Sequence, residues 1–146
     1  MTRDKFKLIH SELIMQVQCI EHDLKLIYAG MCKGDFDKNL DALEKVNLGS
    51  MIKKVKELDY SDGHPDLTKR DYMLLEKIRE IRNYWCHQCF IDYVYISDDY
   101  ARERKFQEIA KRLSEDENQT WELHQHLQQL RNNCLLYTSD AADDRI

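Results

Sequence analysis

Apolar residues recur along the first part of the chain at alternating steps of three and four, and this spacing constrains the fold more than any other feature. The repeat consists of Phe6, Ile9, Leu13, Val17, Ile20, Leu24, Ile27 and Met31. It places one apolar stripe along a helix from about Asp4 to Lys33, which Gly34 ends. At a rise of about 1.5 Å per residue this helix is about 45 Å long, enough to organise an antiparallel bundle.

Few residues interrupt helices in the rest of the chain. The sequence of 146 residues has one proline and four glycines, and no segment alternates Val, Ile or Thr with polar residues over the length of a strand. The length suits one domain and is too short for two. The fold is therefore predicted to be all-α, an antiparallel bundle of four to five helices in a single domain that spans residues 1–133.

Three segments are predicted between residues 35 and 66. A short helix covers about 35–45, and Asn47 is a suitable N-cap for the helix that follows it. That helix turns a core face of Leu48, Met51, Ile52, Val55 and Leu58 inward and leaves three lysines outside. Residues 59–66 contain glycine, proline, serine and aspartate and form the clearest loop.

Helical periodicity resumes at Leu67 or Thr68 and continues to the end of the predicted domain. The core stripe of this helix consists of Tyr72, Leu75, Ile78, Ile81, Trp85 and Cys89. Residues 91–99 form a connector whose apolar members are expected to fold onto the bundle. A last helix covers 99–133, and its polar middle, residues 114–119, predicts a bend or break.

The composition excludes several classes of protein. A formal net charge of -5 argues against a nucleic-acid footprint over the whole surface, so any polyanion must meet a local basic patch. No run approaches about 18 consecutive apolar residues, which excludes a membrane-spanning helix. The five cysteines lack the spacing of a disulfide framework, and the N-terminus lacks the apolar core of a secretory signal. A cytoplasmic protein with reduced thiols is expected.

The last segment of the chain differs from the rest. Residues 134–146 begin Cys-Leu-Leu-Tyr-Thr-Ser-Asp-Ala-Ala-Asp, which resembles the conceptual translation of a transposase adapter used in sequencing libraries. The helical pattern is expected to end at Asn133, before this segment. Residues 134–146 are therefore predicted to be a non-native tail and are excluded from the domain.

Residues 80–90 concentrate a cation, an amide, an imidazole, two thiols and three aromatic rings at the predicted end of a helix. Once the core stripe is assigned, Arg82, Asn83 and His87 remain. A histidine near neutral pKa is suited to remove a proton from a ribose 2′-hydroxyl. An arginine is suited to hold the attacked phosphate, with Asn83 as a polar accessory. These residues fit metal-independent cleavage of RNA, although the same types also occur as structural pairs.

The spacing of Arg82 and His87 has a geometric consequence. Five residues on a straight helix separate two side chains by about 140° and a rise of about 7.5 Å. A composite site then needs a bent helix end or a second copy of the motif across a symmetric interface, which predicts a homodimer.

Two cysteines beside this motif raise the question of a metal. Cys86 and Cys89 form a Cys-x-x-Cys pair, but structural zinc usually needs a second pair, and a thioredoxin-type site needs a preceding strand. Two buried thiols are expected, with no metal and no cofactor.

The segment from Arg82 to His87 resembles the signature of the HEPN superfamily (higher eukaryotes and prokaryotes nucleotide-binding), an arginine and a polar residue followed by a histidine. Residues 47–54 are similar to the Leu-Gly stretch that precedes the motif helix in bacterial members, and Phe90 matches an aromatic residue after the histidine. The resemblance covers most of residues 4–133.

The resemblance implies a helical bundle that dimerises with its motifs facing each other. It implies an endoribonuclease of a toxin or phage-defence type that leaves 2′,3′-cyclic phosphate ends, with Arg82, Asn83 and His87 as catalytic residues. An antitoxin or a nucleotidyltransferase is the implied partner. The toxin branch has a tyrosine two residues after the histidine, where this chain has Cys89, so modification at that place is not expected. The alternatives are a non-catalytic module of the same fold that binds RNA or nucleotide, and a purely structural bundle.

Two basic regions are candidates for RNA binding. Lys53 and Lys54 lie on one predicted helix, and Arg102 and Arg104 lie on the last one. Both regions also suit an ordinary solvated helix face. His124 and His126 do not share a helix face and are expected to be exposed.

Overall fold

The computed structural model describes the backbone of residues 1–143 and the side chains of residues 1–134. The helices are α1 (Arg3–Met31), α2 (Phe36–Asp41), α3 (Leu48–Tyr60), α4 (Lys69–His87), α5 (Ile91–Val94) and α6 (Asp99–Asp143). No strand occurs among the described residues, so the prediction of an all-α helical bundle is confirmed. Four of the helices have 13 or more residues, while α2 and α5 are short.

Polar side chains begin the helices at the predicted places. Asn47 accepts a hydrogen bond from the backbone N–H of Ser50 and caps α3, as expected. Thr68 and Asp71 form a reciprocal capping box at the start of α4. Gly34, at a φ of 104°, allows the turn that follows α1 because a residue without Cβ adopts this conformation freely.

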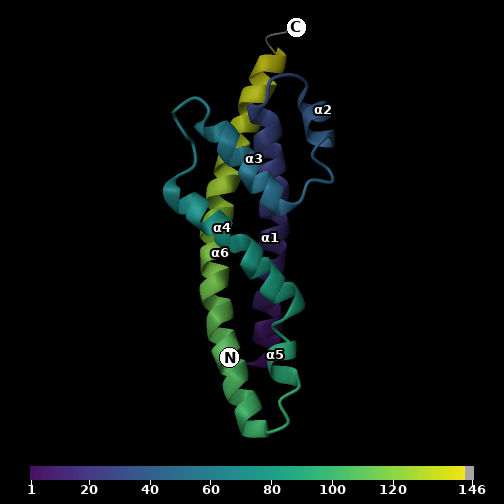
Figure 1. Ribbon diagram of the computed structural model, residues 1–146, viewed down its shortest axis with the longest axis vertical. Coiled ribbons are helices and arrows are strands. Elements are labelled where there is room, and N and C mark those ends of the chain that lie inside the picture. Colours follow the sequence, from purple (N-terminus) through teal and green to yellow (C-terminus); the bar gives the residue numbers. More distant parts are fainter. Residues whose placement is uncertain (144–146) are drawn as a thin grey trace.

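The two longest helices lie side by side along the long axis of the molecule (Figure 1). Arg3 contacts Glu103 at one end and Asp23 contacts Arg131 towards the other, so α1 and α6 run parallel. Helix α4 is antiparallel to α1, since Trp85 contacts His10. The chain therefore ascends in α1, returns in α4 and ascends again in α6. The predicted antiparallel packing holds for α4 but not for the α1–α6 pair.

Two hydrophobic clusters fill the bundle, one in each half. The first joins the second half of α1 to α3, the start of α4 and the later part of α6. The second joins the first half of α1 to the end of α4, α5 and the start of α6, and its largest members are Phe6, Trp85 and Phe106. This second cluster lies beneath residues 80–90.

A polar layer separates the two clusters and explains why α6 does not break. Gln16 of α1 donates a hydrogen bond to Glu117, and Trp85 Nε1 donates one to Asp116. The Thr120 hydroxyl donates to the Asp116 carbonyl. Asp116 and Glu117 therefore have partners across the bundle, and α6 is continuous through residues 114–119, so the predicted break is wrong.

Two further expectations need correction. In the connector after α4, Tyr93 is buried and Ile96 is half-buried, while Ile91, Val94 and Tyr95 are exposed. Helix α6 does not end at Asn133 but continues to Asp143. Cys134 packs against α1 at Gly30. A Cβ added to Gly30 would lie 3.2 Å from the Cβ of Cys134. The rest of the predicted tail, residues 144–146, lies outside the described residues.

Among the described residues, no helix combines the length and the apolar character needed to cross a membrane.

Candidate functional site

The last two turns of α4 divide between the core and the surface as predicted. Ile81, Trp85 and Cys89 are 7%, 1% and 1% exposed and hold the helix against the second hydrophobic cluster. Between them, Arg82 is half-buried, whereas Asn83 and His87 are exposed. The three residues predicted to be catalytic are thus among those that the core leaves out, together with Cys86.

Arg82 is held by groups on both sides. Its Nη1 donates to Glu21 Oε1 of α1 at 2.9 Å, and its Nη2 donates to Asn83 Oδ1 at 3.4 Å. The side chains of Arg82 and Glu21 are 33% and 32% exposed, so water reaches the ion pair. Sequence reasoning missed Glu21, because a glutamate beside the apolar stripe of a long helix is an ordinary surface residue.

His87 is the last residue of α4 and faces solvent. It has no hydrogen bond and no ion pair with any residue that the structure describes. The structure therefore brings Arg82 and Asn83 together and leaves His87 apart from them. Within one chain these three residues do not form a closed catalytic site.

The end of α4 is fixed by contacts that the sequence did not reveal. His10 Nε2 lies 2.7 Å from the carbonyl oxygen of Trp85, and its ring packs against Phe6 and Phe90. Cys89 Sγ also donates to the same carbonyl. These contacts satisfy a carbonyl in the last turn of α4, where the helix has no partner of its own.

A carboxylate joins α4 to α5. Asp92 Oδ2 accepts a hydrogen bond from the Tyr84 hydroxyl at 2.9 Å, and Asp92 Oδ1 accepts one from Gln88 Nε2 at 2.8 Å. The hydrogen bonds from Gln88 and Tyr84 lower the pKa of Asp92. Burial and the hydrogen bond to Asp92 raise the pKa of Tyr84. The backbone on both sides of His87 is therefore well anchored, although its own side chain is open.

The two thiols of this segment have different surroundings. Cys89 is buried, and burial raises its pKa to about 11, so it remains a protonated thiol. Cys86 is exposed, so the expectation of two buried thiols is correct for Cys89 and wrong for Cys86. The described residues contain no group of three or more His, Cys, Asp or Glu side chains arranged for a metal.

The residues predicted to bind RNA do not form one surface. Lys53 lines a cleft between α3 and α4, whereas Lys54 lies 5.8 Å from the centre of the Tyr28 ring on α1. Arg102 donates hydrogen bonds to the Ile96 carbonyl and to the Asp99 carboxylate, while Arg104 is exposed. The pair on α3 and the pair at the start of α6 lie in opposite halves of the bundle (Figure 1).

The histidines of α6 are not both exposed. The side chain of His124 is only 13% exposed and lies 4.0 Å from Asp23, so the prediction that His124 is exposed is wrong. It faces α1 because the parallel pairing brings this part of α6 against Asp23. His126 is 50% exposed, and its Nδ1 lies 2.8 Å from Asp71 Oδ1 at the start of α4.

Exposed apolar side chains gather immediately after His87. They are Phe90, Ile91, Val94, Tyr95 and Tyr100, with exposed fractions from 38% for Phe90 to 82% for Tyr95. This group is called the α5 apolar surface below. Five large exposed apolar side chains within eleven residues make this segment a candidate interaction surface.

Comparison of the chain with protein-family models, curated proteins and solved structures gives no match.

Proposed function

We propose that this protein is a metal-independent endoribonuclease whose Arg82, Asn83 and His87 cleave RNA to 2′,3′-cyclic phosphate ends. One observation carries the proposal. At the end of α4, the residues that match the arginine and histidine of the HEPN motif lie outside the core, where a substrate can reach them.

Each residue has a role suited to its surroundings. His87, open to solvent, acts as the base that takes the proton of the ribose 2′-hydroxyl. Arg82 donates to the phosphate oxygens and stabilises the charge that grows on them. Asn83, already bonded to Arg82, orients the guanidinium. The 2′-oxygen forms a bond to phosphorus as the bond between phosphorus and the 5′-oxygen of the next nucleotide breaks, and the leaving 5′-oxygen takes a proton from water.

The proposed enzyme is a homodimer, because one chain leaves His87 apart from Arg82. The α5 apolar surface lies beside His87 and is the surface on which a second copy would pack. Two-fold symmetry would place the His87 of each copy opposite the Arg82 of the other. The burial of five large apolar side chains would supply the driving force for association.

The biological setting that suits this activity is a toxin or phage-defence system in the cytoplasm, with an antitoxin or a nucleotidyltransferase as partner. The place of the modified tyrosine of the toxin branch holds Cys89, which is buried and protonated at neutral pH. Inhibition by a bound antitoxin therefore fits this chain better than modification of that residue.

The experiment is an RNA-cleavage assay in the presence of EDTA. We expect cleavage with 2′,3′-cyclic phosphate ends, and a loss of at least about 100-fold in His87→Ala and in Arg82→Ala. His64→Ala is the matched control, because His64 is an exposed histidine in the loop between α3 and α4. Cleavage that persists in both site variants would refute the proposal.

A second candidate is a non-catalytic module that binds RNA or nucleotide. The Arg82–Glu21 ion pair favours it, since a guanidinium with a carboxylate partner is less available to a phosphate. This candidate predicts no cleavage by the wild-type protein, together with RNA binding that Arg82→Ala weakens.

A further inference from the structure

Helices α3 and α4 pack across one side of the pair formed by α1 and α6 (Figure 1). Away from that side, exposed residues of α1 recur at alternating steps of three and four, which places them on one face of the helix: Leu8, Ser11, Met15, Gln18 and His22. Exposed residues of α6 recur at the same steps: Asn118, Trp121, Gln125, Gln128 and Asn132. Together these residues are called the α1–α6 outer face below.

The two lines of residues lie on the same side of the helix pair. Met15 is about 140° around α1 from His10, which meets α4, and about 100° from Gln16, which meets α6. Trp121 is about 140° around α6 from Asp116, which also meets α4. Both lines therefore point away from α4, and they form one continuous face.

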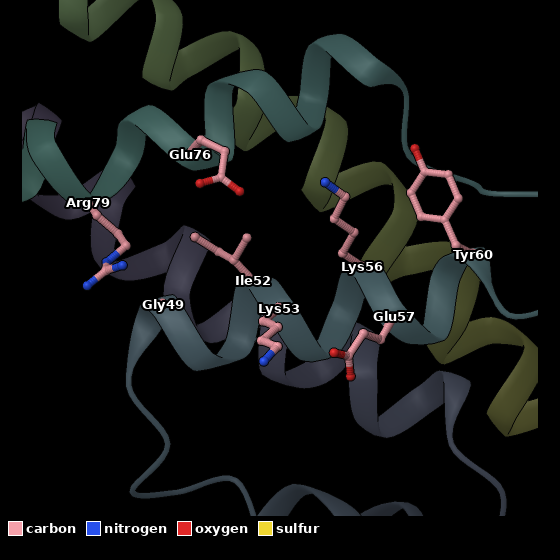
Figure 2. A pocket seen from close by; sticks show the side chains of 8 residues that line it. All are labelled: Gly49, Ile52, Lys53, Lys56, Glu57, Tyr60, Glu76 and Arg79. Atoms are coloured by element: carbon pink, nitrogen blue, oxygen red, sulfur yellow. The ribbon is translucent and has the colours of Figure 1, made fainter.

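The α1–α6 outer face carries no formal charge at neutral pH, although 34% of the residues in the chain are charged. The side of α3 and α4 is different. Figure 2 shows a cleft between these helices whose lining includes the charged residues Lys53, Lys56, Glu57, Glu76 and Arg79. A helix face that stays in water usually carries charges of this kind. Depletion of charge is instead typical of the centre of a protein interface.

Large apolar side chains lie within this uncharged face. Leu8, Met15 and Trp121 are 69%, 49% and 46% exposed. Gln16 donates a hydrogen bond to Glu117, so Met15 and Trp121 are about five residues apart along the bundle, a rise of about 7 Å. Methionine and tryptophan are enriched at protein interfaces, and here they stand close together near the middle of the face.

We propose that the α1–α6 outer face packs against the same face of a second copy of the chain, in an interface separate from the α5 apolar surface. Two copies with a net charge of -5 each repel one another, and the repulsion is weakest where uncharged faces meet. The amides of Gln18, Asn118 and Gln125 both donate and accept hydrogen bonds, so the face can pair with itself. Such self-complementarity is what a two-fold interface requires, whereas a charged face would need an oppositely charged partner.

The size of the face suits this occupant. It extends roughly 30 Å along the helices and about 20 Å across the two of them, or about 600 Å² per copy before the relief of the side chains is counted. A standard protein interface buries about 800 Å² per partner. The outer face shares no residue with the α5 apolar surface. Chains that used both surfaces would form a tetramer or a longer array.

Sedimentation equilibrium tests the inference in an Ile91→Lys, Tyr95→Lys background, in which two charges disrupt the α5 apolar surface. We expect this protein to remain a dimer through the outer face. Addition of Met15→Lys, which brings a like charge from each copy into the interface, should raise the dissociation constant at least about tenfold. Met73→Lys is the matched control, because Met73 is 46% exposed on α4, outside the face. It should change the constant less than about twofold.

The inference is overturned if the background protein is a monomer at all concentrations, or if Met15→Lys and Met73→Lys have equal effects. Both outcomes concern association alone, so they do not depend on whether the protein cleaves RNA. Met15 and Met73 are each about half exposed, so a lysine at either position should leave the fold intact. Circular dichroism of each variant checks this.

Trp121 reports on the same interface without a substitution in the outer face. The chain has two tryptophans, and Trp85 is 1% exposed, so the neutral quencher acrylamide acts mainly on Trp121. In the background protein we expect quenching to increase on dilution, over the concentrations at which the mass falls from dimer to monomer. Quenching that stays constant while the mass falls would place the interface elsewhere and overturn the inference.

Discussion

The two ends of α4 differ in how completely their polar side chains are paired. At the start of the helix, Thr68 and Asp71 cap each other, and Asp71 also bonds to His126 of α6. At the end, Asn83 reaches only its neighbour Arg82, and His87 has no described partner. A histidine lies at each end, His126 of α6 at the start and His87 at the end, but only His126 has a partner among the described residues.

The difference separates structural from functional polar groups. Asp71 is buried, so its carboxylate must be paired for the fold to be stable. His87 is exposed, where an unpaired side chain costs nothing, and its position is free to serve a ligand. Removal of a polar group at the start of α4 should therefore affect stability, and removal at its end should affect function.

The largest stability effect is expected at Asp59, in the last turn of α3, which holds the loop that leads into α4. This buried carboxylate accepts hydrogen bonds from the backbone N–H groups of Asp66 and Leu67 and from the Tyr72 hydroxyl. Asp59→Ala leaves three donors without their partner and should lower the free energy of unfolding by about 3 kcal/mol. Urea unfolding measures the change.

Asp62 supplies the matched control for this prediction. It accepts one hydrogen bond from the His64 backbone in the same loop, but it is exposed. Asp62→Ala should change the free energy of unfolding by less than about 0.5 kcal/mol. Equal effects of the two variants would show that the start of α4 is not held by buried polar contacts.

The second prediction compares the two histidines directly. His126→Ala removes the hydrogen bond to Asp71 and should cost about 1 kcal/mol, less than a fully buried charged bond because His126 is half exposed. His87→Ala should leave the free energy of unfolding within about 0.5 kcal/mol of wild type. Urea unfolding of the two variants at neutral pH tests the contrast, which fails if His87→Ala is the less stable of the two.

The third prediction concerns how the free energy of unfolding depends on pH through Asp71, at the start of α4. Burial alone would raise the pKa of Asp71, but the hydrogen bonds from His126 and Thr68 lower it. A carboxylate with a lowered folded-state pKa stabilises the fold above its unfolded pKa of about 4, and this contribution is lost as the pH falls through the folded value.

Without His126 the pKa of Asp71 should lie nearer to its unfolded value. His126→Ala should therefore lose less stability than wild type as the pH falls below about 4, and the two unfolding curves should converge. Free energies of unfolding measured from pH 7 to pH 3 test this expectation. A difference in free energy of unfolding between wild type and His126→Ala that stays constant from pH 7 to pH 3 would mean that His126 does not act through Asp71.

The same contrast shows what the sequence can predict. The helix of residues 4–33, the cap Asn47 and the core stripe of α4 follow from local periodicity and capping chemistry, and the structure has all of them. The separation of Arg82, Asn83 and His87 from that stripe also followed from residue spacing alone.

Contacts between distant segments could not be predicted in this way. His10, Glu21 and His124 look like ordinary polar positions in sequence, and only the pairing of α1 with α4 and α6 gives them partners. Residues 114–119 suggested a break for the same reason, because the partners of Asp116 and Glu117 on α4 and α1 are far away in the chain.

The smallest stability effect is expected at Glu21, the partner of Arg82. An ion pair whose side chains are each about one third exposed contributes little, so Glu21→Gln should change the free energy of unfolding by less than about 0.5 kcal/mol.

A double-mutant cycle with Arg82→Ala separates two roles of the arginine. If Arg82 serves the surface pair alone, Glu21→Gln and Arg82→Ala should have equal effects on stability and none on RNA cleavage. If Arg82 holds the phosphate, Glu21→Gln should retain cleavage, because the guanidinium keeps its charge and its bond to Asn83, whereas Arg82→Ala should abolish it in either background. Cleavage rates and unfolding free energies of the four proteins decide between these roles.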